Sequence, residues 1–154
     1  MKKILVAVDD TKSSLKAVDV MPRLFACSMP EKVVLLYVQK MEGRSVMDEL
    51  ILSDSELETL KESMQGTDYQ DKLHARAKKV IVYYRDRLAE KGIKPVKPVV
   101  KEGHPAEEIL KTAEEEDVDL IVMGARGKRL HNLFMGSVSR EVANKAPMSV
   151  LLIK

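Results

Sequence analysis

This chain contains four apolar runs that are largely unbroken. Segments whose apolar residues recur at helical spacing separate them. The runs cover residues 4–8, 33–38, 118–123 and 150–153. A strand buried on one face alternates apolar and polar residues, whereas a strand buried on both faces reads as a continuous apolar run. We therefore expect a parallel sheet with helices on both of its faces.

Segments with helical spacing lie between these runs. Pro22 lies inside the first of them and removes one intrahelical hydrogen bond, so we expect it to kink or shorten that helix. Pro105 suits the first position of the third helix, where its missing N–H costs nothing. The apolar residues recur at helical spacing within residues 15–25, 73–88, 106–113 and 138–146.

A fifth, weaker strand is expected at residues 96–100. Pro98 lies within it and has no N–H to donate to a neighbouring strand, which favours a position at the edge of the sheet. Strands and helices alternate along the chain, apart from a long insert after the second strand. This order predicts the fold class: α/β, with a doubly wound, five-stranded parallel sheet sandwiched by helices.

The chain of 154 residues is long enough for one well-buried domain and too short for two. We expect residues 1–154 to form that domain, with an insert at residues 41–71. The insert is longer than most connections between elements, and its apolar residues hint at helical segments. Two interpretations stay open: a lid over the site, or an excursion packed on the surface.

Composition narrows the classes of function. The chain has 45% hydrophobic and 32% charged residues, as ordinary globular proteins do, and its net charge of +2 predicts no general affinity for nucleic acid. The single cysteine, Cys27, excludes an internal disulfide and indicates a reducing compartment; we expect it to be packed. The apolar run at residues 4–8 is too short for a signal peptide or a membrane span. These features predict a cytoplasmic protein.

The segment after the third of these runs carries the clearest chemistry. It reads Met123-Gly124-Ala125-Arg126-Gly127 and is followed by Gly136-Ser137-Val138-Ser139 at the start of the last helical segment. Glycines let backbone N–H groups approach an anion closely, and a helix N-terminus adds a partial positive charge. In doubly wound sheets, ligands bind beyond the carboxyl ends of the strands, where the winding direction reverses. If the strands before Asp9 and Gly124 are neighbours, both residues face one phosphate-binding crevice.

These residues resemble a known family. Residues 123–127 with Gly136-Ser137 closely resemble the G-x2-G-x9-G-[ST] signature of the ATP-binding universal stress proteins. The opening strand and its Asp9, the second strand, and the stretch from Glu102 to Leu110 are also similar to that family, so the resemblance covers nearly the whole chain. Eight residues separate Gly127 from Gly136, one fewer than in the family pattern. A tighter turn absorbs this deletion, or the deletion narrows the phosphate cradle; both outcomes stay open.

The resemblance implies a fold, a ligand and a partner. The fold is the adenine nucleotide alpha hydrolase-like (universal stress protein) fold, and the ligand is ATP or another adenine nucleotide, with or without Mg²⁺. It also implies a homodimer through the C-terminal strand, Ser149 to Ile153, whose free edge invites pairing with a second copy. The nucleotide-binding residues that the resemblance implies are Ala7, Val8, Asp9, Val38, Met123, Gly124, Arg126, Gly127, Gly136, Ser137, Val138 and Ser139.

The resemblance also implies a role for each part of that set. Asp9, with the backbone of the two residues before it, lies against the ribose and adenine, and Val38 lines the adenine pocket. Residues 123–127 approach the ribose and phosphates, and residues 136–139 hold the phosphate chain. Simpler interpretations exist: Asp9 could cap the first helix, and the glycines could serve turns alone.

The sequence contains little that indicates an enzyme. The chain contains no G-x-x-x-x-G-K-[ST] phosphate loop and no convincing nucleophile–base set, and no histidine has a partner at metal-ligand spacing. We therefore predict a binding protein in stress-response signalling. It has no catalytic residue and no metal site, and its ATP hydrolysis is slow or absent.

Three alternatives stay open. One is a stress protein that binds no nucleotide and works through protein partners that the sequence does not identify. Another is an ATP-using transferase, with Asp10 and Lys12 as candidate groups. The third is a phosphoacceptor receiver domain, in which the acidic pair after the first strand holds Mg²⁺ beside Asp54, with Lys94 or Lys97 as its lysine.

Overall fold

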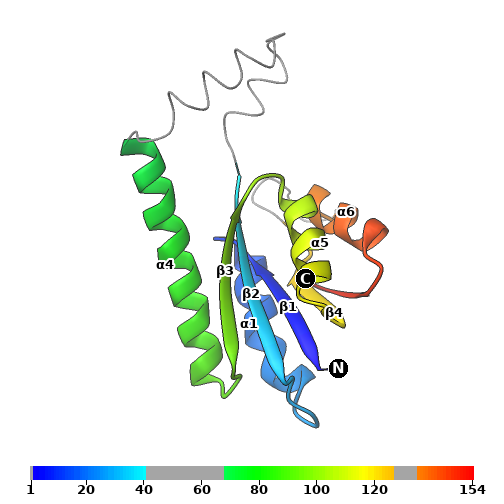
Figure 1. Ribbon diagram of the computed structural model, residues 1–154. Coiled ribbons are helices and arrows are strands. Elements are labelled where there is room, and N and C mark those ends of the chain that lie inside the picture. Colours follow the sequence, from blue (N-terminus) through cyan, green and yellow to red (C-terminus); the bar gives the residue numbers. More distant parts are fainter. Residues whose placement is uncertain (1, 41–67, 127–134) are drawn as a thin grey trace.

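A parallel sheet lies between helices in the structure, a computed structural model that describes residues 2–40, 68–126 and 135–154 (Figure 1). The sheet has five strands in the order β3-β2-β1-β4-β5. These are β1 (Lys3–Val8), β2 (Lys32–Gln39), β3 (Val96–Glu102), β4 (Leu120–Gly124) and β5 (Ser149–Ile153). The described helices are α1 (Lys12–Leu24), α4 (Asp68–Glu90), α5 (Pro105–Glu115) and α6 (Ser137–Lys145). The predicted fold class is confirmed.

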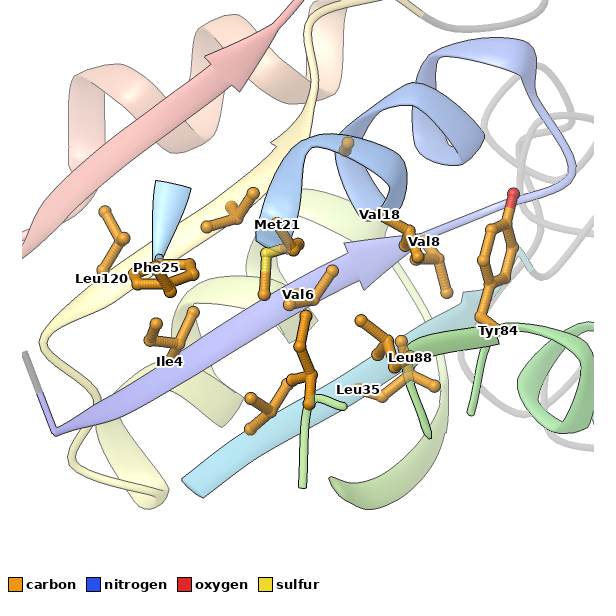
Figure 2. Close-up of a cluster of buried hydrophobic side chains, with 14 of the residues drawn as sticks. Ile4, Val6, Val8, Val18, Met21, Phe25, Leu35, Tyr84, Leu88 and Leu120 are labelled. Carbon is orange, nitrogen blue, oxygen red and sulfur yellow. The ribbon is translucent and has the colours of Figure 1, made fainter. Parts of the chain in front are cut away.

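Both faces of the sheet are buried, as the apolar runs predicted. Along β1, Ile4, Val6 and Val8 point into a cluster with α1 and α4, which Figure 2 shows. Leu5 and Ala7 point the other way, into a cluster with α5 and α6. None of these five side chains is more than 7% exposed. Because successive side chains of a strand point to opposite faces, a strand covered on both sides is apolar at every position.

Two prolines lie where the sequence analysis expected them to affect helices. Pro105 begins α5 at its first turn, as predicted. Pro22 lies inside α1, which ends two residues later at Leu24. Phe25 belongs to the apolar pattern of this helix and stays buried, but it is the residue that caps the helix end.

The two edges of the sheet are formed by β3 and β5. The edge position predicted from Pro98 is therefore confirmed: β3 pairs with β2, and Pro98 lies opposite Leu35. At the other edge, β5 pairs with β4. Residues 150–153 of β5 are only half-buried, in contrast to the fully buried centre of β1.

Two predicted boundaries and one predicted burial were wrong. β4 begins at Leu120 rather than at residue 118, because the N–H of Val118 donates to Ala113 O of α5 at 3.0 Å and belongs to the turn after that helix. Residues 68–71 of the predicted insert belong to α4, and the rest of the insert lies outside the described residues. Cys27 is exposed, because it follows α1 in a turn. None of the described helices is both long and apolar enough to cross a membrane.

Candidate functional site

The carboxyl ends of β1 and β4 lie side by side near the middle of the sheet. Ala7 of β1 pairs with Met123 of β4 in parallel register, and β1 is the strand at which the order of the sheet changes direction. Asp9 and Gly124 therefore end neighbouring strands, as the sequence analysis required for a shared crevice. Ligands of doubly wound sheets bind at such a switch point.

The start of α6 is attached to the end of β4. The N–H of Gly136 donates to Ala125 O at 2.8 Å, and the hydroxyl of Ser139 donates to the same carbonyl at 2.9 Å. Ser139 is buried and also lies 3.0 Å from Gly136 O. These bonds bring residues 136–139 to the end of β4, although Gly127 and the cationic residues that follow it lie outside the described residues.

The N-terminus of α6 has open backbone donors. Gly136 is the N-cap, with φ −61° and ψ 154°, and no side chain caps this helix. Among the described residues, no acceptor receives the N–H groups of Ser137, Val138 and Ser139. The first N–H groups of a helix have no intrahelical acceptor, and together with the helix dipole they favour an anion. The hydroxyl of Ser139, in contrast, is already bound to carbonyl oxygens, so only its backbone N–H is open.

Three of the predicted residues share one face of the sheet. Ala7 and Met123 belong to the cluster under α5 and α6, and Val38, near the carboxyl end of β2, packs against it. Val8 points to the opposite face, under α1 and α4. Ala7 and Met123 are buried in this cluster, so of these side chains only the partly buried Val38 is open to a ligand on the α5/α6 face.

Asp9 holds the turn between β1 and α1. Its Oδ1 accepts hydrogen bonds from Thr11 N at 2.9 Å, from Thr11 Oγ1 at 2.5 Å and from Ser14 Oγ at 2.6 Å. The N–H of Asp9 donates back to Ser14 Oγ at 3.0 Å. Thr11 is the N-cap of α1, and its hydroxyl accepts from Ser14 N. Asp9 thus organises the helix start. Its other carboxylate oxygen, Oδ2, makes no hydrogen bond with the described residues.

Two residues that the sequence analysis did not assign to the site contact it. Tyr84 of α4 donates its hydroxyl to Asp9 O at 3.0 Å; burial, with the nearby Asp9 charge, raises the pKa of Tyr84 to about 12. Ser13 of α1 packs against Gly124. Helical spacing marked Tyr84 only as an apolar face residue, and no local pattern marks Ser13, because both contacts join segments far apart in the sequence.

A shallow groove of about 370 Å³ opens on the other face, between the start of α1 and α4. None of the residues predicted to bind nucleotide lines it. Asp10 and Lys12, the candidate groups of the transferase alternative, do line it, and Asp10 forms an ion pair with Arg76. Its lining residues are Asp10, Thr11, Lys12, Leu15, Lys79, Val80, Tyr83 and Tyr84.

The receiver-domain alternative is wrong where the structure tests it. Its lysine has to lie at the same end of the sheet as the acidic pair that follows β1. Lys97 lies instead near the amino end of β3, and its Nζ is 2.5 Å from Glu116. Lys94 precedes β3 at that same end, and Asp54 lies outside the described residues. No group of acidic, histidine or cysteine side chains among the described residues is arranged to hold a metal ion.

Comparisons with known proteins agree with this fold. The model of the "Universal stress protein family" matches residues 1–154. The "Universal stress protein MJ0577" of Methanocaldococcus jannaschii is 32% identical, over 99% of this chain and 94% of its own. The solved structure of MJ0577 superposes with a TM-score of 0.76 at 30% identity, covering 99% of this chain and 95% of the other.

Two further solved structures share the fold at lower identity. A universal stress protein in complex with cAMP has a TM-score of 0.68 at 20% identity, covering 99% of this chain and 97% of its own. The universal stress protein from Archaeoglobus fulgidus in complex with dAMP has a TM-score of 0.60 at 21% identity, covering 100% and 98%. With a family model that matches its whole length and a relative 32% identical over nearly all of it, this chain belongs to the universal stress protein family.

Proposed function

We propose that this protein binds an adenine nucleotide, ATP or a close relative of it, at the carboxyl ends of β1 and β4. The observation that carries the proposal is the uncapped start of α6. Its open N–H groups are fixed to the end of β4 by the bonds of Gly136 and Ser139 to Ala125 O. Open donors at a helix start, held beside the switch point of a parallel sheet, suit a phosphate group.

The proposed binding residues divide by chemistry. Val38 offers apolar surface near the carboxyl end of β2, which suits adenine. Asp9, with the backbone of Ala7 and Val8, borders the ribose and adenine. The remaining residues approach the ribose and the phosphate chain; they are Met123, Gly124, Arg126, Gly127, Gly136, Ser137, Val138 and Ser139. Arg126, half-buried after β4, adds a cation on that side.

Two relatives support the choice of adenine. One solved structure with this fold is in complex with cAMP and another with dAMP, so adenine nucleotides occupy proteins of this family. A diphosphate or triphosphate would bring Mg²⁺ with it, because magnesium is usually held through phosphate oxygens. The proposed ligand is therefore ATP, ADP or AMP, with Mg²⁺ where the phosphate chain is long enough.

The proposed activity is binding, with slow or no hydrolysis. A water-activating base needs a free acceptor within reach of the phosphates. In the described part of the site, the Oδ1 atom of Asp9 is occupied by Thr11 and Ser14, and the hydroxyl of Ser139 by carbonyl oxygens. The open Oδ2 atom of Asp9 borders the ribose and adenine in this proposal rather than the phosphates, so neither residue supplies a base for hydrolysis.

We further propose that the chain is one cytoplasmic domain that forms a homodimer through β5. This strand, Ser149–Ile153, lies at the sheet edge, and its residues 150–153 are apolar and half-buried. The backbone hydrogen-bonding groups on its outer side are open for pairing with a second copy. Light scattering of the purified protein tests the dimer: the mass of a single chain at micromolar concentration contradicts it.

Calorimetric titration of nucleotide-free protein tests the binding proposal. ATP with Mg²⁺ is expected to bind in the micromolar range, and GTP, the control, much more weakly. No heat at millimolar ATP, ADP or AMP contradicts the proposal. In that case the shorter spacing between Gly127 and Gly136, eight residues, favours the second candidate function: a stress protein that works through protein partners alone.

A further inference from the structure

Ser13, the second residue of α1, lies where three distant segments meet. It is 8% exposed and contacts the end of β4, the residues that follow β4, and the end of β5. The proposed function assigns it no role. Its contacts nevertheless reach the backbone that is proposed to approach the phosphates.

The first contact is steric. A Cβ atom added to Gly124 would lie 2.7 Å from Ser13 Cβ and 2.8 Å from Ser13 C. Carbon atoms in contact are about 3.5 Å or more apart, and one of the two obstructing atoms belongs to the backbone of α1. Gly124 is therefore required for the close approach of α1 to β4, and Ser13 in turn limits where the end of β4 can lie.

The second contact is a shared hydrogen-bond network. The N–H of Arg126 donates to Ser13 Oγ at 3.4 Å, and Ser13 Oγ donates to Ile153 O at 3.4 Å. Ile153 O also accepts from Ala125 N at 2.7 Å. One side-chain hydroxyl therefore links the backbone just after Gly124 to the last residue of β5.

We infer that Ser13 is a positioning residue, which sets the backbone of residues 124–126 for the phosphate part of the nucleotide. This inference rests on the proposed nucleotide function. Removing the hydroxyl frees the N–H of Arg126 and leaves Ile153 O with Ala125 alone, so the segment after β4 loses a link to α1. The adenine contacts proposed for Ala7, in β1, and for Val38, in β2, do not involve Ser13.

The experiment compares Ser13→Ala with Thr112→Val. Thr112 is a matched control, because its hydroxyl is also buried, on α5, but has no partner among the described residues. Calorimetry measures the affinity of the wild type and of both variants for ATP and for adenosine, which lacks phosphates. Amide hydrogen exchange at Ala125 and Arg126 is measured by NMR without nucleotide.

Ser13→Ala is expected to weaken ATP binding about fivefold, the range of one lost hydrogen bond, and to leave adenosine binding within about twofold. The Arg126 amide is expected to exchange about fivefold faster, and Thr112→Val to match the wild type in both measurements. A protein that is merely destabilised would lose affinity for ATP and for adenosine equally, and this outcome overturns the inference. An unchanged affinity of Ser13→Ala for ATP also overturns it.

Failure of the proposed function itself gives a different result. If the wild type binds neither ATP nor adenosine, the nucleotide proposal fails, and amide exchange alone decides the positioning role. Faster exchange at Arg126 in Ser13→Ala then supports the positioning role of Ser13, and unchanged exchange overturns it.

Discussion

The two ends of the parallel strands are held by different kinds of interaction. At the amino ends, ions pair with one another. The carboxylate oxygens of Glu116 lie 2.8 Å from Lys32 Nζ and 2.5 Å from Lys97 Nζ, and these two ammonium groups lower the pKa of Glu116 to about 2. Nearby, Asp119 Oδ2 accepts the backbone N–H groups of Lys2 and Lys3 at 2.7 and 2.9 Å.

At the carboxyl ends, hydroxyl groups and the Asp9 carboxylate bind the turns after β1 and β4, and an ion pair of Asp10 with Arg76 joins the first of these turns to α4. Asp9 organises the start of α1 through Thr11 and Ser14, and Ser139 attaches α6 to Ala125. The first N–H groups of α6 find no acceptor among the described residues. These bonds fix the backbone without neutralising the helix N-terminus.

The difference separates stability from binding. At the amino ends, Glu116 and Asp119 already have cationic or N–H partners, so that end ties strands and helices together. At the carboxyl ends, rigid turns present open donors, and rigid open donors bind an anion without reorganising. Substitutions at the amino ends should therefore change stability alone, whereas substitutions at the carboxyl ends should change stability where they disturb packing or the turns and binding where they reach the proposed ligand.

Gly124→Val should have the largest effect, and on stability. The new side chain meets Ser13 Cβ and backbone at 2.7 and 2.8 Å, so we expect the free energy of unfolding to fall by about 3 kcal/mol, measured by urea denaturation. Gly92→Ala is the control: φ is +78° there, but no atom lies within 4 Å of the new Cβ, so the cost is about 1 kcal/mol. Equal losses would contradict the steric explanation.

Gly127→Val should abolish nucleotide binding and leave the fold intact. On the proposed function, a side chain at this position occupies the space of the phosphates, so affinity falls at least about 100-fold, or about 2.7 kcal/mol. Calorimetry measures the affinity, and thermal melting monitored by circular dichroism checks the fold. Retained affinity would move the site away from this segment.

Glu116→Gln should weaken the amino ends and change the response to acid. With the pKa of Glu116 lowered from 4.5 to about 2, its contribution is complete above pH 4.5 and is lost as the pH falls from 4.5 to 2. We expect the variant to lose about 1 kcal/mol at pH 7 and to show a shallower loss of stability over that pH range, by urea denaturation. Glu115→Gln, whose more exposed carboxylate lies 3.4 Å from Lys101 Nζ, is the control; an identical acid response in both variants would contradict this assignment.

Tyr84→Phe should have a small effect on stability, at the carboxyl ends. It removes the bond to Asp9 O and should cost about 1 kcal/mol, whereas Tyr83→Phe, on a half-exposed side chain, should cost almost nothing. Because the pKa of Tyr84 is raised from 10 to about 12, the wild type should lose stability as the pH rises from 10 to 12, and Tyr84→Phe should lose less. The melting temperatures of both proteins are measured from pH 10 to pH 12. The same fall in both proteins would contradict this prediction.

Local patterns predicted most of the fold. Unbroken apolar runs predicted strands buried on both faces, Pro98 predicted an edge strand, and Pro105 a helix start, because each depends on residues within one element. Two predictions failed at element ends. Val118 extends an apolar run but bonds to α5, and residues 68–71 look like an insert but begin α4.

The candidate site was predicted only in part. The position of Asp9 and Gly124 after strands 1 and 4 could be read along the chain, and their adjacency depended on a strand order that the structure supplied. Asp9 had two possible roles in the sequence, as a ligand contact and as a helix cap. The N-cap of α1 is Thr11 instead, and Oδ1 of Asp9 supports that cap by accepting hydrogen bonds from Thr11 and Ser14. The position of Gly127, outside the described residues, stays a prediction.

Periodicity and glycine spacing are local properties, and so they determine the elements, their burial and the family of this chain from the order of its residues alone. Which groups meet at the carboxyl edge is a different matter. Ser13 reaches Ile153 across 140 positions, and Tyr84 reaches Asp9 across 75. No local pattern encodes such pairs, because they form only when packing of the sheet and helices brings their backbones within hydrogen-bonding distance.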